Sequence, residues 1–106
     1  MYQDLSPAEF AKLREVDAAW QLLDVREPWE IDIVSLPDTI RIPLAEVPAR
    51  VDELDAERPL AVICHSGGRS ARAAGFLAAN GFARVANIAG GIDAWSQELD
   101  RSLPRY

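Results

Sequence analysis

A continuous apolar run near the middle of the chain limits the folds open to this sequence more than any other feature. Residues 60–64, Leu-Ala-Val-Ile-Cys, follow Pro59 without an interrupting charged side chain. Runs of this kind are typical of a parallel strand that is buried on both faces. Gly67 and Gly68 come shortly afterwards, and residues 70–80 carry small and apolar side chains at helical spacing. The segment therefore predicts a buried strand, a tight loop and a helix.

The same alternation of strand-like and helix-like segments runs through the rest of the chain. Strands are expected over residues 20–25, 39–42, 60–64 and 85–88, and helices over residues 7–15, 44–54, 70–80 and 92–99. The helix over residues 44–54 should be interrupted or shifted by Pro48. The first helix has the clearest start, because Ser6 can cap it, Pro7 suits its first position and Glu9 completes a capping box. Strands that alternate with helices indicate an α/β fold with a central, mainly parallel sheet flanked by helices. A length of 106 residues fits one domain, which we expect to span residues 1–106.

Composition and charge exclude several classes of protein. Apolar residues make up 49% and charged residues 26% of the chain, which is a globular rather than a disordered balance. The 17 acidic and 11 basic side chains give a net charge of −6, which argues against nucleic acid or a membrane surface as the main partner. The sequence shows no signal-peptide pattern and no apolar stretch long enough to span a bilayer. One cysteine and one histidine permit no internal disulfide and suit no structural zinc site, so we expect a cytoplasmic protein without metal or cofactor.

The loop between the buried strand and the next helix carries the residues best suited to chemistry. It consists of Cys64, His65, Ser66, Gly67, Gly68, Arg69 and Ser70. The first free N–H groups of a helix and its dipole stabilise a thiolate, which is the nucleophilic form of cysteine. Gly67 and Gly68 lack a Cβ, so the backbone of the loop can bend through positive φ and bring its amides close to an anion. Arg69 and Arg72 are expected to add positive charge around the mouth of the loop.

Each of these residues also has a plainer interpretation. Cys64 could be a small buried hydrophobic residue at the end of a strand, as free cysteines often are. His65 is more readily an exposed loop residue than a general base, because neighbours along the chain rarely have the geometry for proton transfer. Asp24 suits a hydrogen-bonding hub, and Arg26 suits an ion-pair partner, better than either suits a direct part in catalysis. The glycines and arginine behind Cys64 favour the chemical interpretation of the loop.

Four motifs, in order along the chain, resemble those of rhodanese-like domains. They are Leu-Asp-Val-Arg-Glu-Pro-Trp-Glu at residues 23–30, Arg-Ile-Pro-Leu at 41–44, the loop at 64–70, and Gly-Gly-Ile-Asp-Ala-Trp at 90–95. The resemblance implies the rhodanese-like three-layer fold. It also implies that a Cys64 persulfide carries sulfur from thiosulfate or another persulfide to cyanide or a thiol. Residues 65–70 would then bind the substrate or the persulfide, with Asp24, Arg26 and Arg72 in support.

The resemblance weakens in one region and extends to the end of the chain in another. Residues 34–39 lack the histidine and second glycine that are usual in the family, and Arg41 replaces the usual asparagine. Residues 103–106 resemble the tail of rhodanese domains attached to enzymes that activate sulfur-carrier proteins, which adds sulfur-relay proteins to the expected partners.

Three alternatives to a thiosulfate sulfurtransferase remain open. A cysteine phosphatase or arsenate reductase places an arginine six residues after the cysteine, but here Ser70 is sixth and Arg69 is fifth. A catalytically silent module of the family that only binds partners would usually lack the cysteine. A persulfide carrier between biosynthetic proteins, with incidental thiosulfate activity, has the same sequence features as a detoxifying enzyme.

Overall fold

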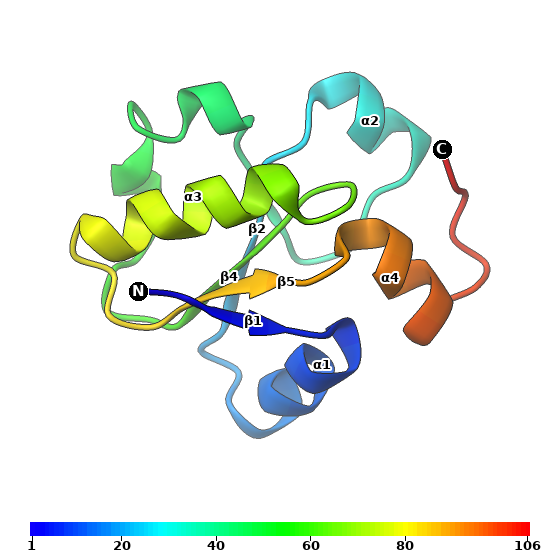
Figure 1. Ribbon diagram of the computed structural model, residues 1–106, viewed down its shortest axis with the longest axis horizontal. Coiled ribbons are helices and arrows are strands. Elements are labelled where there is room, and N and C mark those ends of the chain that lie inside the picture. The colour runs from blue at the N-terminus through cyan, green and yellow to red at the C-terminus, as the bar shows by residue number, and fades with distance from the viewer.

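A parallel sheet of five strands forms the centre of the computed structural model, which describes residues 1–106 (Figure 1). The strands are β1 (Gln3–Leu5), β2 (Gln21–Asp24), β3 (Ile40–Arg41), β4 (Leu60–Ile63) and β5 (Val85–Ile88), in the order β1-β5-β4-β2-β3. The helices are α1 (Pro7–Val16), α2 (Pro28–Ile33), α3 (Gly68–Ala79) and α4 (Gly91–Glu98), with 3₁₀ turns η1 (Leu44–Glu46) and η2 (Val51–Glu53). None of these helices has the length and hydropathy needed to cross a membrane. All four strand pairings are parallel, which confirms the expected fold class.

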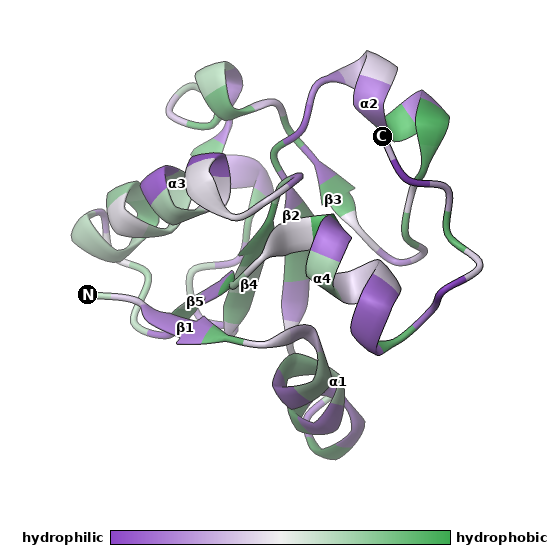
Figure 2. Ribbon diagram, turned by 45° about the vertical axis from the view of Figure 1, so that its right-hand side comes forward, coloured by the Kyte–Doolittle hydropathy of each residue, from purple (hydrophilic) through white to green (hydrophobic).

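The helices cover the two faces of the sheet and give the fold three layers. On one face, α3 and the 3₁₀ turns pack over a core cluster that includes Leu23, Val62 and Leu77. On the other face, α1 and α4 pack over a second cluster that includes Phe10 and Ile63. Figures 1 and 2 show α3 on the side of the sheet away from α1 and α4. Alternate side chains of one strand therefore enter different cores.

The apolar run at residues 60–64 lies where the sequence predicts it. β4 pairs with β2 on one side and β5 on the other, and all four of its residues are buried. Because both of its faces are covered and both of its edges are paired, no position along the strand favours a polar side chain. Cys64 follows its last residue and so lies at the carboxyl edge of the sheet, where ligands bind in such folds.

Helix starts follow the capping signals in the sequence. Ser6 Oγ accepts a hydrogen bond from the Glu9 amide at 3.1 Å, and Glu9 Oε1 accepts one from the Ser6 amide at 2.8 Å, which confirms the expected capping box of α1. α2 was not expected from the sequence, although the same capping signal is present there. Pro28 takes the first helical turn, and Glu30 Oε1 accepts from the Glu27 amide at 3.0 Å.

The helix expected over residues 44–54 does not form, because the structure has the two short turns η1 and η2 there, but the expected interruption at Pro48 falls between them. Pro48 has no N–H to donate to the carbonyl one turn earlier, and its ring would clash with that carbonyl in a helix. β1 was also not predicted, since three residues at the sheet edge carry little pattern. Finally, α3 begins at Gly68 rather than Ser70, which places Arg69 in its first turn.

Candidate functional site

The sulfur of Cys64 lies between the end of β4 and the start of α3. The residue is only 1% exposed, and its Sγ accepts hydrogen bonds from the Gly67 amide at 3.1 Å and the Ser70 hydroxyl at 3.3 Å. Gly67 is the N-cap residue of α3, so the positive end of the helix dipole is at the sulfur. Two donors and a helix N-terminus all favour a negatively charged sulfur over a neutral one.

Of the two loop glycines, only Gly67 needs the freedom that glycine gives. Its φ is +107°, and a Cβ there would approach the amide nitrogen of Gly90 to 3.2 Å. Gly68 has no atom near its missing Cβ and is already part of α3. The expected positive φ is therefore confirmed at Gly67 but not at Gly68. Gly67 turns the chain so that its own N–H points at Sγ.

A second helix holds the opposite side of the loop. The amide of Ile92, at the start of α4, donates to the Cys64 carbonyl at 2.9 Å, and the amide of Asp93 donates to the His65 carbonyl at 3.2 Å. A Cβ on Gly91 would lie 2.5 Å from both of these carbonyl oxygens. The Gly-Gly motif before α4 is thus needed for close approach as well as for a turn. The loop is fixed between two helix N-termini.

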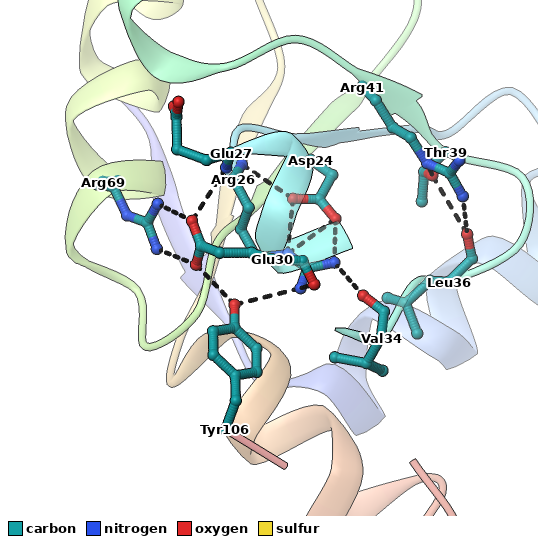
Figure 3. Close-up of polar contacts among 10 residues, drawn as sticks. All are labelled: Asp24, Arg26, Glu27, Glu30, Val34, Leu36, Thr39, Arg41, Arg69 and Tyr106. Carbon is teal, nitrogen blue, oxygen red and sulfur yellow. Dashed lines mark hydrogen bonds and ion pairs between the residues drawn. The ribbon is translucent and has the colours of Figure 1, made fainter. Parts of the chain in front are cut away.

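Asp24 and Arg26 form a buried ion pair beneath α2. Arg26 Nη2 lies 2.8 Å from Asp24 Oδ2, and the two side chains are 0% and 1% exposed. The remaining guanidinium hydrogens reach the carbonyls of Glu30, at 3.3 Å, and Val34, at 2.8 Å, at the two ends of the helical turn (Figure 3). Neither side chain contacts Cys64, so the structural interpretation of this pair is the better one.

Arg69 forms a bidentate ion pair with Glu30. Its two terminal nitrogens lie 2.6 and 2.8 Å from the two carboxylate oxygens of Glu30, whose side chain is 3% exposed (Figure 3). Tyr106 completes the group, because its hydroxyl donates to Glu30 at 2.6 Å and accepts from Arg26 at 3.2 Å. Burial and the hydrogen bond to Glu30 raise the pKa of Tyr106 to about 12. A carboxylate therefore offsets the positive charge of Arg69, and the mouth of the loop is less cationic than the sequence suggests.

The other predicted residues lie around the sulfur without reaching it. The ring of His65 stacks on Tyr106 at 4.0 Å, and its Nε2 lies 3.2 Å from Asp93 Oδ1 without the alignment of a hydrogen bond. Ser66 is exposed. Arg72 lines a hollow of about 110 Å³ beside η1, together with apolar side chains such as Val47.

Three residues at the site were not recognised as functional candidates from the sequence. Glu30 belongs to the first motif, but its partner Arg69 is 39 positions away. Asn87 lies in β5 and contacts Ser70, and a polar residue within a short apolar strand was a signal for it. Tyr106 lies in the segment that resembles a family tail, and nothing local in the sequence places it over His65.

Acid should reveal the contribution of Glu30 to stability. The Arg69 guanidinium, helped by the Tyr106 hydroxyl, lowers the pKa of Glu30 from 4.5 to about 2. A depressed pKa in the folded state gives stability that is present above pH 4.5 and is lost as the pH falls towards 2. We expect the melting temperature, followed by circular dichroism, to fall more steeply over this range in the wild type than in Glu30→Gln. Glu53→Gln, in an exposed ion pair, is the control and should change the slope less. Parallel curves for wild type and Glu30→Gln would contradict the assignment.

Comparison with known proteins agrees with this geometry. The sequence profile of the rhodanese-like domain family matches residues 6–98. A rhodanese-related protein from Thermoplasma volcanium superimposes with a TM-score of 0.81 at 36% identity, over 92% of this chain and 94% of that one.

Two curated relatives differ in how much of their own length the chain covers. The chain is 44% identical over 90 residues to rhodanese-like/PpiC domain-containing protein 12 of Arabidopsis thaliana, covering 81% of this chain but only 30% of that protein. It is 31% identical to a thiosulfate sulfurtransferase of Pseudomonas syringae, over 89% of this chain and 87% of the relative. With the profile match, the shared fold and the loop at the end of β4, these similarities show that the chain belongs to the rhodanese-like domain family.

Proposed function

We propose that this chain is a sulfurtransferase that moves sulfur through a persulfide on Cys64. The observation that carries the proposal is the position of Sγ, which accepts hydrogen bonds from the Gly67 amide and the Ser70 hydroxyl at the start of α3. Sulfur transfer alternates between a thiolate and a persulfide, and donors at this position stabilise the thiolate both as nucleophile and as leaving group. Relatives named as sulfurtransferases, such as that of Pseudomonas syringae, support the same conclusion.

The reaction consists of two displacements at sulfur. The Cys64 thiolate attacks the outer sulfur of thiosulfate, forming a new S–S bond while the old one breaks and sulfite leaves with the electron pair. A cyanide ion or thiolate then attacks the terminal sulfur of the persulfide, and the Cys64 thiolate is released with its electron pair. No proton transfer is needed when the acceptor is already an anion, which agrees with the absence of a contact between His65 and Sγ. We propose no metal or cofactor in either step.

The arrangement of Arg69 disfavours a phosphatase. A cysteine phosphatase needs a guanidinium that faces the oxyanion bound above the sulfur. Here both terminal nitrogens of Arg69 are engaged by Glu30, and Ser70 at the sixth position presents its hydroxyl to Sγ. The buried sulfur also limits direct access to small donors.

Intact-mass measurement after thiosulfate treatment tests the proposal. The wild type should gain the mass of one sulfur atom and should lose it when cyanide is added. Cys64→Ser, which keeps the volume and polarity of the side chain, should show neither change. A wild type that gains no sulfur from thiosulfate or from glutathione persulfide would contradict the function.

The physiological acceptor is a separate proposal. Relatives include a putative sulfur carrier protein of Bacillus subtilis and an adenylyltransferase and sulfurtransferase of Arabidopsis thaliana, of which the chain covers 52% and 25%. These names favour a relay to a sulfur-accepting protein over detoxification of cyanide. Discharge of the preformed persulfide to a protein thiol at a higher kcat/KM than to cyanide would support the relay, and the opposite order would argue for a small-molecule acceptor.

A further inference from the structure

A row of polar side chains connects the edge of the sheet with the sulfur of Cys64. Asn87 Nδ2 donates to Asp4 Oδ1 at 3.0 Å and more weakly to the Gly67 carbonyl at 3.4 Å. Its Oδ1 accepts a hydrogen bond from Ser70 Oγ at 2.5 Å, and the same oxygen of Ser70 lies 3.3 Å from Cys64 Sγ. Ser70 is 0% exposed and Asn87 is 5% exposed, so water does not compete freely for these groups.

The hydroxyl of Ser70 has two acceptors but only one hydrogen. If Cys64 is a neutral thiol, its S–H can donate to Ser70 Oγ while Ser70 donates to Asn87. If Cys64 is a thiolate, Sγ has no hydrogen and needs a donor, so Ser70 must turn towards it. The buried Oδ1 of Asn87 then loses the only side-chain donor within hydrogen-bonding distance. A buried carbonyl without its donor is destabilising, so the two acceptors compete for one hydrogen.

We propose that Asn87 is a positioning residue that competes with the Cys64 thiolate for the hydroxyl hydrogen of Ser70. The consequence for catalysis rests on the proposed function. In a persulfide, Sγ bridges two atoms and the negative charge lies on the terminal sulfur, so Ser70 can return to Asn87. Asn87 therefore favours the sulfur-loaded cysteine over the free thiolate. It keeps the thiolate reactive by limiting how strongly Ser70 stabilises it.

The direct test measures how the rate of Cys64 alkylation by iodoacetamide depends on pH. Asn87→Leu keeps the number and branching of the side-chain heavy atoms but removes the competing acceptor, so Ser70 is free to donate to the thiolate. We expect the midpoint of the alkylation profile to fall by about one pH unit, which corresponds to about 1.4 kcal/mol. Ser70→Ala removes the donor and should raise the midpoint. In the Ser70→Ala background, Asn87→Leu should cause little further shift, because the weak 3.4 Å bond to the Gly67 carbonyl is the only other contact between Asn87 and the loop.

Two results would overturn the proposal. One is an unchanged or raised midpoint in Asn87→Leu, and the other is an equal shift with and without Ser70. The wild type provides a second measurement that needs no change in the core. The side-chain amide resonances of Asn87 should move as Cys64 titrates, and they should not move in Ser70→Ala.

Alkylation requires no sulfur transfer, so this test and the test of function can fail independently. If the alkylation midpoints shift as expected but the protein takes up no sulfur, the proposed sulfurtransferase function is contradicted. The competition between Asn87 and Cys64 for the hydroxyl hydrogen of Ser70 would still stand. If both hold, a preformed persulfide should discharge to cyanide up to about tenfold faster in Asn87→Leu, because the departing thiolate is better stabilised. Slower discharge in that variant would contradict the role assigned to Asn87 in the loaded state.

Discussion

Replacing Cys64 with alanine is expected to reduce sulfur transfer from thiosulfate to cyanide to the rate without protein. The chain contains no other cysteine, so no second thiolate can take the sulfur. The substitution should leave the fold intact, because alanine fits the buried space and Sγ accepts only two hydrogen bonds. We expect a loss of about 1 kcal/mol in the free energy of unfolding, as is common for a buried substitution. Steady-state assays together with urea unfolding separate these two effects.

The controls decide whether a lost activity has a chemical or a structural cause. Cys64→Ser restores a polar group that Gly67 and Ser70 can still reach, yet it should be as inactive as alanine. Val16→Ala, on an exposed side chain of α1, should retain wild-type activity. Transfer activity above background in a folded Cys64→Ala protein would contradict a mechanism through this residue.

The strand, loop and helix around Cys64 could be predicted because their determinants are local. The unbroken apolar run indicates that β4 is buried on both faces, and Gly67 indicates the turn that follows the strand. The resemblance to a family added the order of motifs. The interruption of the helix expected over residues 44–54 also has a local cause, since Pro48 lies between the two 3₁₀ turns that the structure has there.

The charge distribution around the site could not be predicted, because it depends on residues that are distant in the sequence. From the sequence, Arg69 is expected to be a free cation beside an anion site. Only the fold brings Glu30 of α2 into contact with it. Tyr106 reaches the same carboxylate from the end of the chain. Asn87 is a further example of a residue that the fold brings to the site. It lies in β5 and acts through its hydrogen bond with the hydroxyl of Ser70 in α3. Spacing along a chain gives no information about such pairings.

The second large effect is expected on stability, from Arg26→Met. Methionine fills much of the volume of the guanidinium side chain but leaves the buried carboxylate of Asp24 without its partner. Removing one member of a buried ion pair typically costs about 3–5 kcal/mol, and the carbonyls of Glu30 and Val34 would also lose donors. Urea unfolding should show this loss as a lower midpoint with an unchanged m-value.

The same substitution at an exposed ion pair provides a matched control for Arg26. Arg50→Met breaks contacts with Glu46 and Glu53 on the surface and should barely move the urea midpoint, because solvent screens that pair. Replacing both members of the buried pair, as Asp24→Leu with Arg26→Met, should recover part of the stability, since it removes the unpaired charge. The recovery should be incomplete, because Asp24 also accepts a hydrogen bond from the Arg26 amide at 3.1 Å. Equal losses from Arg26→Met and Arg50→Met would mean that the buried pair does not hold α2 against the sheet.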